Sequence, residues 1–490
     1  MTAAVPDPTT GPTADVTADL VVLGAGATGL GAARAARAGG ARVVLVEAER
    51  PGGDCTHYGC VPSKALLETA RRVAAARSGP RYGFSAQVDV DFRAVMDRVA
   101  AVVAEVEHDE SPETLAAEGI ELLAGRGSFT DARTLEVRGA DGATRTVRSE
   151  RFVVATGSRA TVPPVDGLDA VAYLDNRTVF DLREQPTHLL VLGGGPIGVE
   201  LAQGFRRLGS QVTVVQSGGR LLPRDDVEAS RALTAVLERE GVRVLTGARA
   251  VAAEPGPVLH LSDGTSLRGS HLLVAAGRTP TSSGFGLERT GARTDDRGRV
   301  VTDGHLRAAP TVWAAGDCTS ALLFTHVGDE QGRLAARNAL AGRRFWRRGS
   351  WDDRVVPWVT FTEPEVAQVG LTEAQALAEH GERVRVAVVR DADADRARTA
   401  GETDGFVKLV AVPGRVGGMV LGRLVGMTAV GPVAGELLGE AALSMRAGTL
   451  VGRLAQTVHA YPTWSLSTRI AAARLFADVG GTGDRPARPE

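Results

Sequence analysis

The stretch LVVLGAGATGL at residues 20–30 decides the fold of this chain. Within it, an apolar run ends at the glycine turn GAGATG of residues 24–29. A helical pattern follows over Leu30–Ala38, and the next apolar run, ARVVLVE, ends at Glu47. This order of strand, turn, helix and strand is typical of the first half of a βαβ unit that binds a dinucleotide.

The same pattern returns in the middle of the chain. The turn GGGPIG at 193–198 lies between an apolar run and a helical pattern, and the strand-like run QVTVVQ follows. Eighteen positions separate Gly198 from Gln216, as they separate Gly29 from Glu47. One such motif is weak, but two copies with matched spacing indicate two dinucleotide sites rather than two ordinary glycine-rich turns.

Composition excludes several other classes of protein. The 490 residues include 56 Lys and Arg against 58 Asp and Glu, a balance that disfavours a nucleic-acid-binding protein. At about 150 residues per domain, the length predicts roughly three domains. Three cysteines exclude a disulfide-rich secreted scaffold. No membrane span and no secretory signal are evident, so we expect a cytoplasmic protein, with floppy tails at 1–17 and 479–490.

Two cysteines lie close together in GGDCTHYGCVPSK, just after the first βαβ unit. Cys55 and Cys60 are five positions apart, which is ~7.5 Å along a regular helix, whereas a disulfide needs Cα atoms within ~6.8 Å. A bridge therefore requires a distorted turn, for which Gly59 and Pro62 are suited. A redox pair is the favoured interpretation; two inert thiols are the alternative, and His57 alone does not complete a zinc site.

A redox cysteine pair between two dinucleotide units predicts a particular chemistry. A nicotinamide delivers hydride to a flavin, and the flavin passes two electrons to a disulfide. Cys60 would face the flavin, and Cys55 would exchange with the substrate. Lys64, one helical turn after Cys60, would favour a thiolate or a reduced flavin, unless it is a surface lysine. Cys318 is interpreted as a small buried side chain, with a third redox thiol as the alternative.

From about Asp19 to Phe476 the sequence resembles the class I FAD-dependent pyridine nucleotide-disulfide oxidoreductases, the family of dihydrolipoamide dehydrogenase, glutathione reductase and mercuric reductase. The resemblance is carried by GAGATG, GGDCTHYGCVPSK, GGGPIGVE, AAGRTP, TVWAAGD, FTHVGDEQG and VPWVTFTEPEVAQVGLTE. It implies an α/β fold with two Rossmann-like, glutathione-reductase-like nucleotide-binding domains plus a C-terminal α+β dimerisation domain. It also implies a homodimeric enzyme. The expected parts are an FAD-binding domain at 18–160 and 284–345, an NAD(P)-binding domain at 161–283 and a dimerisation domain at 346–478.

The same resemblance assigns candidate site residues. Those expected to bind FAD are Gly24, Gly26, Gly29, Glu47 on the ribose, Gly53, Lys64, Thr156, Gly157, Asp317 on the ribityl chain, and His326. Those expected to bind NAD(P) are Gly193, Gly195, Gly198, Gln216, Ser217, Arg220 and Gly277. The expected catalytic residues are Cys55, Cys60, Lys64 with its partner Glu200, His459 and Tyr461. No metal is expected.

Two departures from the family pattern bear on the substrate and the cofactor. Tyr461 and Leu466 stand where the family has a histidine base and its orienting glutamate. Tyrosine, with a pKa near 10, suits thiol proton transfer poorly. His459 is a candidate substitute, because residues two apart share a face on a strand, and a packing or surface histidine is the alternative. Where an acid usually accepts from the ribose of NAD, this chain has Gln216, which does not repel a 2′-phosphate.

These departures leave alternatives open. Ser217, Arg220 and Arg224 are candidates to bind a 2′-phosphate, so we expect NADPH in preference to NADH, unless Arg220 is a solvated loop residue. The expected acceptor is a small disulfide, or a dithiol in the reverse direction. One alternative is a flavin reductase of quinones, metal ions or other acceptors that uses the cysteines little. The other is a non-catalytic redox-sensing or complex subunit.

Overall fold

A computed structural model describes residues 16–342, 348–416 and 419–477, and it divides into two compact units. Unit 1 contains the chain up to Pro62, Arg98–Thr161 and Arg278–Trp351. Unit 2 contains Ser63–Asp97, Val162–Gly277 and the chain from Asp352. Of the tail expected at 1–17, only β1 (Val16–Thr17) is described, and the tail expected at 479–490 lies outside the described residues.

The centre of unit 1 is a six-stranded sheet in the order β18, β19, β8, β2, β3, β4. These strands are β18 (Arg307–Ala309), β19 (Val312–Ala314), β8 (Phe152–Val154), β2 (Leu20–Leu23), β3 (Val43–Glu47) and β4 (Ile120–Ala124). All neighbours are parallel except β18 and β19. Strand β2 is buried throughout, as expected for a central parallel strand.

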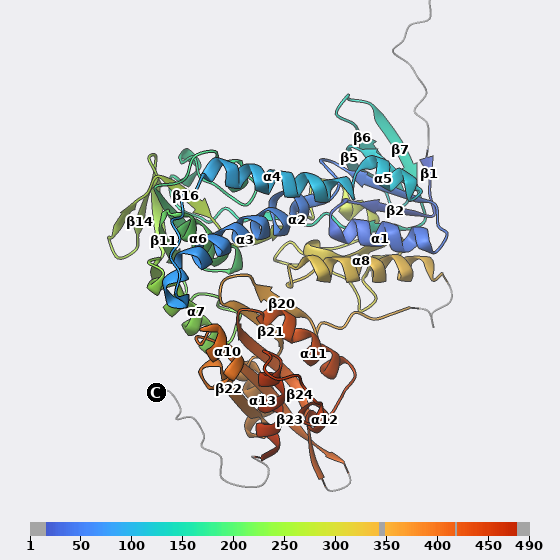
Figure 1. The fold of residues 1–490 in the computed structure, drawn as a ribbon. Coiled ribbons are helices and arrows are strands. Elements are labelled where there is room, and N and C mark those ends of the chain that lie inside the picture. The colour runs from blue at the N-terminus through green and yellow to red at the C-terminus, as the bar shows by residue number, and fades with distance from the viewer. Residues whose placement is uncertain (1–15, 343–347, 417–418, 478–490) are drawn as a thin grey trace, which may run out of the picture. The chain divides into compact units, whose positions relative to one another are not determined.

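Two layers cover this sheet. Leu20 and Val22 belong to the core formed with α1 (Ala27–Ala38) and α8 (Thr325–Leu340), which lie side by side in Figure 1. Val21 and Leu23 belong to the core formed with a smaller sheet. That sheet has the order β1, β7 (Thr144–Arg148), β6 (Thr134–Arg138), β5 (Arg126–Asp131). Strands β9 (Ser158–Ala160) and β17 (Arg278–Pro280) pair separately.

Unit 2 has a parallel sheet and an antiparallel sheet. The parallel sheet has the order β12 (Arg243–Thr246), β11 (Gln211–Gln216), β10 (His188–Leu192), β16 (His271–Val274). Helix α6 (Pro196–Leu208) connects β10 to β11, and α7 (Val227–Arg239) connects β11 to β12. The meander β13 (Ala250–Glu254), β14 (Val258–Leu261), β15 (Ser266–Arg268) packs in the same core. The antiparallel sheet has the order β20 (Pro357–Thr360), β21 (Glu365–Gly370), β24 (Met419–Gly431), β23 (Phe406–Val416), β22 (Arg385–Arg390).

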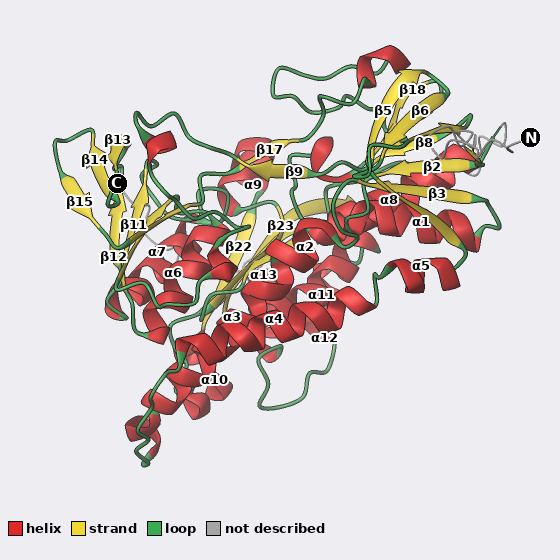
Figure 2. Cartoon of the chain, turned by 90° about the horizontal axis from the view of Figure 1, so that it is seen from above, coloured by secondary structure: helices red, strands yellow, loops and turns green. Residues whose placement is uncertain are grey.

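Helices complete the two units. The C-terminal sheet packs against α11 (Ala434–Arg446), α12 (Val451–Gln456) and α13 (Leu466–Ala477), and α9 (Glu373–His380) and α10 (Asp395–Ala400) connect its strands. A capping box of Thr372 and Gln375 begins α9, which satisfies the exposed N–H groups of its first turn. The remaining helices, visible in Figure 2, are α2 (Gly53–Tyr58), α3 (Cys60–Arg77), α4 (Phe92–His108) and α5 (Pro112–Ala117). In the described part of the chain, no helix is both long and apolar enough to cross a membrane.

Candidate active site

Glycine shapes the turn between β2 and α1. Gly24 has a φ of +102°, and a Cβ there would lie 2.4 Å from the carbonyl oxygen of Ala155. A Cβ on Gly29 would lie 1.8 Å from the carbonyl oxygen of Gly24, so α1 packs directly on the turn. Helix α1 begins after Gly26 with neither a side-chain cap nor an acidic residue in its first turn. The positive end of the helix dipole therefore fits the pyrophosphate of FAD.

The turn between β10 and α6 is built in the same way. A Cβ on Gly198 would lie 2.0 Å from the carbonyl oxygen of Gly193. Helix α6 begins after Gly195, again without a side-chain cap or an acidic residue in its first turn. Gly277, on the chain after β16, adopts a φ of +121°. The second turn therefore fits a second pyrophosphate, that of NAD(P).

In each βαβ unit, the last residue of the second strand accepts a hydrogen bond from the glycine turn. Glu47 Oε2 accepts a hydrogen bond of 2.6 Å from the N–H of Ala25. Gln216 Oε1 accepts one of 3.0 Å from the N–H of Gly194, the matching position. The two turns thus have the same architecture, but the second has a neutral amide where the first has a carboxylate.

The residues after Gln216 form the loop expected to meet the adenosine end of NAD(P). Ser217 is exposed. Arg220 donates to the carbonyl oxygens of Leu222 and Pro223 at 3.0 and 2.7 Å, so its guanidinium folds onto its own loop. Arg224 is exposed beyond it. Ser217, Arg220 and Arg224 thus lie in one short loop, and the two arginines give it two positive charges.

The expected distorted turn between the cysteines is observed. Helix α2 ends at Tyr58 and α3 begins at Cys60, with Gly59 between them. A Cβ on Gly59 would lie 2.8 Å from the carbonyl oxygen of Asp54, so the chain turns too sharply there for a larger residue. The prediction that Gly59 breaks the helix is confirmed.

This break brings both sulfur atoms to one hydroxyl group. Thr325 Oγ1 donates to Cys55 Sγ at 3.2 Å and lies 3.4 Å from Cys60 Sγ. Both cysteines are thiols in the structure. A hydrogen bond with Cys60 and burial strongly raise the pKa of the Cys55 thiol. Thr325 begins α8 and was not predicted as a site residue: it lies in the motif FTHVGDEQG, but the motif does not indicate a contact with a cysteine 270 positions away.

An arginine that sequence reasoning missed organises the expected flavin residues of unit 1. Arg278 donates to the side chain of Ser158 at 2.7 Å and to its carbonyl oxygen at 2.9 Å, and it pairs with Asp54, the neighbour of Cys55. Ser158 in turn donates to Asp317 at 2.5 Å. Burial raises the pKa of the Asp317 carboxyl, although Ser158 and Arg278 oppose this.

The other expected FAD residues of unit 1 lie on loops or at a helix end. Thr156 donates to the carbonyl oxygen of Thr281, and Gly157 accepts from the N–H of the same residue, so the two segments are held together. Gly53 lies against Gly26, where a Cβ would meet the Gly26 Cα at 2.8 Å. His326 is exposed in the first turn of α8 and stacks on Phe324. Among the described residues, no group of three or more metal-ligating side chains is arranged to hold a metal ion.

Within unit 2, the structure brings the expected Lys64 and Glu200 together. Lys64 Nζ donates to Glu200 Oε2 at 2.8 Å. Lys64 Nζ also lies 4.5 Å from the ring centroid of Phe361, which is a cation–π distance. The Glu200 side chain is only 5% exposed, so Lys64 supplies the partner that a buried carboxylate needs.

His459 and Tyr461 have different surroundings, because the segment that holds them is irregular rather than a strand. The His459 ring is 6% exposed, with Nε2 3.0 Å from Glu440 Oε2 and Nδ1 3.0 Å from the carbonyl oxygen of Thr457. Tyr461 is 70% exposed and donates to Asp395 at 2.9 Å. This bond raises the pKa of the Tyr461 phenol, which makes it a still weaker candidate for proton transfer. The His459–Glu440 contact was not predicted.

Comparison with known proteins identifies the family. Residues 18–339 match the family described as pyridine nucleotide-disulphide oxidoreductase, and residues 356–472 match its dimerisation domain. A mercuric reductase of Streptomyces lividans is 38% identical over 470 residues, which cover 94% of this chain and 97% of that protein. Dihydrolipoyl dehydrogenase 3 of Pseudomonas aeruginosa is 35% identical over 408 residues, which cover 80% and 85%.

Solved structures agree with this comparison. LpdA of Mycobacterium tuberculosis superposes with a TM-score of 0.83 at 30% identity. RclA of Escherichia coli, an HOCl-induced flavoprotein disulfide reductase solved as a Cu(II) complex, superposes with a TM-score of 0.82 at 28% identity. Each similarity covers 94% of this chain and 99% of the other.

The fold and both nucleotide turns define a two-dinucleotide flavoprotein, and the chain belongs to the pyridine nucleotide-disulphide oxidoreductases. It is an FAD-dependent disulfide oxidoreductase that uses NAD(P)H, and its dimerisation domain indicates a homodimer. The predicted family, fold class and enzyme class are therefore confirmed, as are FAD and NAD(P)H as cofactors, and the preference for NADPH stays a prediction. The two alternatives, a flavin reductase that uses the cysteines little and a non-catalytic subunit, are not favoured.

Proposed function

We propose that this enzyme passes two electrons from NADPH, by way of FAD, to a small disulfide in the cytoplasm. Bound FAD supplies hydride acceptance from the nicotinamide and electron transfer to a disulfide. The observation that carries the proposal is the contact of both cysteine sulfurs with the hydroxyl of Thr325, at 3.2 and 3.4 Å. In the balanced reaction, NADPH, one proton and one disulfide yield NADP⁺ and two thiols.

The two cysteines have different roles in this proposal. The Cys55 thiolate attacks the substrate disulfide, forms a mixed disulfide and releases the first thiolate. The Cys60 thiolate then attacks the Cys55 sulfur, forms the Cys55–Cys60 disulfide and releases the second thiolate. Reduction of that disulfide through the flavin, with Lys64 stabilising negative charge, returns the dithiol.

Proton transfer is assigned to His459 rather than Tyr461, which requires His459 to exchange one of its two ring contacts, with Glu440 or with the Thr457 carbonyl oxygen, for the thiol. Because the pKa of the Cys55 thiol is raised, its deprotonation at neutral pH needs a base. His459 is an imidazole held by Glu440, whereas the hydroxyl of Tyr461 is bonded to Asp395 and has a raised pKa. In this proposal Glu440 takes the orienting role of the family's glutamate, whose position Leu466 occupies in this chain.

Mercuric ion is a second candidate acceptor, favoured by the 38% identity to a mercuric reductase. Cys55 and Cys60 would bind it as thiolates. The chain's third and last cysteine, Cys318, is buried and donates to the carbonyl oxygens of Ala315 and Val154, so it is unsuited to hand over a metal ion. NADPH oxidation assays with small disulfides and with mercuric ion separate the two candidates.

Anaerobic reduction of the FAD-loaded enzyme tests the proposed chemistry. One equivalent of NADPH is expected to give a long-wavelength absorption band between a thiolate and the oxidised flavin, because electrons reach the cysteine pair and leave the flavin oxidised. The measurement is a spectrophotometric titration. Simple bleaching of the flavin, with no such band at any equivalence, would contradict electron transfer to the pair.

Replacing Gln216 with glutamate is expected to shift the cofactor preference toward NADH by about tenfold or more. The glutamate retains the acceptor for the Gly194 N–H, but its charge repels a 2′-phosphate and accepts from a ribose hydroxyl. The measurement is the ratio of kcat/KM for NADPH to that for NADH. Gln216→Asn, which stays neutral, is the control, and a wild-type enzyme with strong NADH preference would overturn the NADPH assignment.

A further inference from the structure

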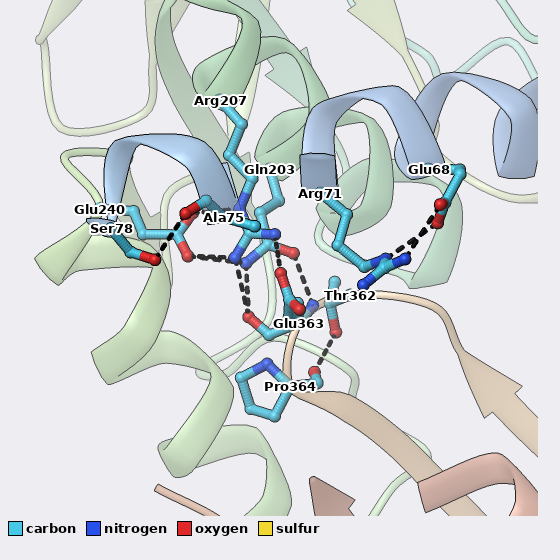
Figure 3. A network of polar contacts seen from close by, with 10 residues as sticks. All are labelled: Glu68, Arg71, Ala75, Ser78, Gln203, Arg207, Glu240, Thr362, Glu363 and Pro364. Carbon is cyan, nitrogen blue, oxygen red and sulfur yellow. Dashed lines mark hydrogen bonds and ion pairs between the residues drawn. The ribbon is translucent and has the colours of Figure 1, made fainter. Parts of the chain in front are cut away.

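One face of α6 holds a short segment of the C-terminal part of unit 2. Glu200, Gln203 and Arg207 are spaced three and four positions apart, so they lie on the same side of the helix. All three contact residues 361–363, which join β20 to β21 and are here called the docking segment. Figure 3 shows Gln203 and Arg207 directed at Glu363.

The docking segment reaches both members of the Lys64–Glu200 pair. The main-chain N–H of Phe361 donates to Glu200 Oε1 at 2.8 Å, while Glu200 Oε2 accepts from Lys64 at 2.8 Å. The Phe361 ring faces the same ammonium group at 4.5 Å from its centroid. Each carboxylate oxygen of Glu200 thus has its own donor. The position of the Phe361 N–H therefore fixes the orientation of the carboxylate toward Lys64.

Gln203 clamps the docking segment by its main chain. Its Oε1 accepts from the N–H of Glu363 at 2.8 Å, and its Nε2 donates to the carbonyl oxygen of Glu363 at 2.7 Å. The Gln203 side chain is 1% exposed. The same amide also donates to Glu240 Oε1 at 3.1 Å. Removing it leaves the partly buried N–H of Glu363 without its acceptor, which costs free energy.

Arg207 holds the side chain of the same residue. Its guanidinium donates to Glu240 at 2.6 and 3.0 Å and pairs with the Glu363 carboxylate. The Arg207 side chain is 11% exposed, so its two carboxylate partners depend on it for neutralisation. Arg77 donates to the Arg207 carbonyl oxygen at 2.6 Å, which ties α3, the helix of Lys64, to the same point of α6.

We propose that Gln203 and Arg207 are positioning residues for Lys64. They fix the docking segment, whose Phe361 N–H and ring orient Glu200 and the ammonium group. The inference rests on the proposed function, in which Lys64, one helical turn after Cys60 in α3, stabilises negative charge during reduction. The docking segment thus has two roles: it connects β20 to β21, and it sets the position of Lys64.

The test compares FAD-loaded dimers of the wild type with Gln203→Leu, Glu363→Gln, Lys64→Met and Asp404→Asn. The readouts are the stopped-flow rate of flavin reduction by NADPH and the intensity of the thiolate–flavin band, with thermal unfolding measured in parallel. Asp404→Asn is the matched control, because it breaks an ion pair with Arg239 that also lies in unit 2 but does not touch Glu200. Glu363→Gln keeps the main-chain clamp, so it reports on Arg207 if Gln203→Leu does not fold.

We expect Gln203→Leu to change both readouts in the same direction as Lys64→Met, with reduction slowed about tenfold, the size of one lost buried hydrogen bond. Glu363→Gln should act in the same direction with about a threefold effect, and Asp404→Asn should stay within about twofold of the wild type. If Lys64→Met changes the flavin but folded Gln203→Leu and Glu363→Gln do not, the positioning role is overturned and the proposed function stands. If Lys64→Met changes neither readout, the role of Lys64 in the proposed function fails as well.

Discussion

Cys60→Ser is expected to lower turnover of disulfides by about 10³-fold or more, while NADPH still bleaches the bound flavin. Serine occupies the space of cysteine but does not form the disulfide that carries the electrons. Cys55→Ser should lose turnover as well, yet it keeps the Cys60 thiol assigned to the flavin. The thiolate–flavin band should therefore survive in Cys55→Ser and vanish in Cys60→Ser. Steady-state assays with a small disulfide and absorption spectra after anaerobic reduction measure the two effects.

Cys318→Ser is the matched control for these variants. Burial raises the pKa of the Cys318 thiol to about 11, and its sulfur lies against carbonyl oxygens 3.2 and 3.6 Å away. A thiol that stays protonated and has no solvent access is a poor nucleophile, so turnover should stay within about twofold of the wild type. Full disulfide turnover by Cys60→Ser would instead support a flavin reductase that bypasses the cysteines.

Local sequence determined those parts of the site that are built from neighbouring residues. The turns at 24–29 and 193–198 could be predicted because close approach of helix and strand leaves room only for glycine. The break at Gly59 could be predicted because two cysteines five positions apart do not pair along a regular helix. In each case the physical constraint acts between residues that are close in the sequence, so the sequence pattern alone is enough to predict the structure.

Apart from the Lys64–Glu200 pair, which the family resemblance implied, the site contacts made across long distances in the sequence were not predicted. Thr325 and Arg278 lie in the motifs FTHVGDEQG and AAGRTP, but nothing in those motifs indicates a contact with the redox segment around Cys55, which is 270 and 224 positions away. Glu440 was missed for the opposite reason: the family pattern directed attention to position 466, but the irregular chain at 457–460 turns the His459 ring toward α11. Packing, rather than any local pattern, selected these partners.

A buried lysine in unit 2 is paired with three carboxylates. Lys408 on β23 is 2% exposed, and its ammonium donates to Asp226 at 3.0 and 3.1 Å and to Glu373 at 2.8 Å. Glu228 lies 3.5 Å away. Asp226 is the N-cap of α7, and Glu373 is the first residue of α9, so the ammonium joins two helix starts to the C-terminal sheet. Burial alone would lower the pKa of Lys408, but Glu373, Asp226 and Glu228 raise it above the usual lysine value.

The sign of the pH dependence follows from this raised pKa. Because the folded protein holds the Lys408 proton more tightly than the unfolded chain, the stabilisation is fully present below the ordinary lysine pKa, about 10.4, and is lost as the pH rises through the folded-state value. The cluster therefore contributes its full stabilisation of the fold at neutral pH.

Lys408→Met is expected to lower the free energy of unfolding by about 3–5 kcal/mol, because it leaves the buried Asp226 carboxylate and two partly exposed glutamates without their cation. The measurement is the urea midpoint of the FAD-loaded protein at neutral pH. Lys408→Met combined with Asp226→Asn should recover part of the loss, since asparagine caps α7 as well as aspartate and removes the most buried charge. Arg239→Met, which breaks the exposed pair with Asp404, is the control and should cost less than about 1 kcal/mol. A Lys408→Met midpoint equal to that of Arg239→Met would contradict this prediction and show that water screens the charges of the cluster. The starts of α7 and α9 would then be held to the C-terminal sheet by apolar packing.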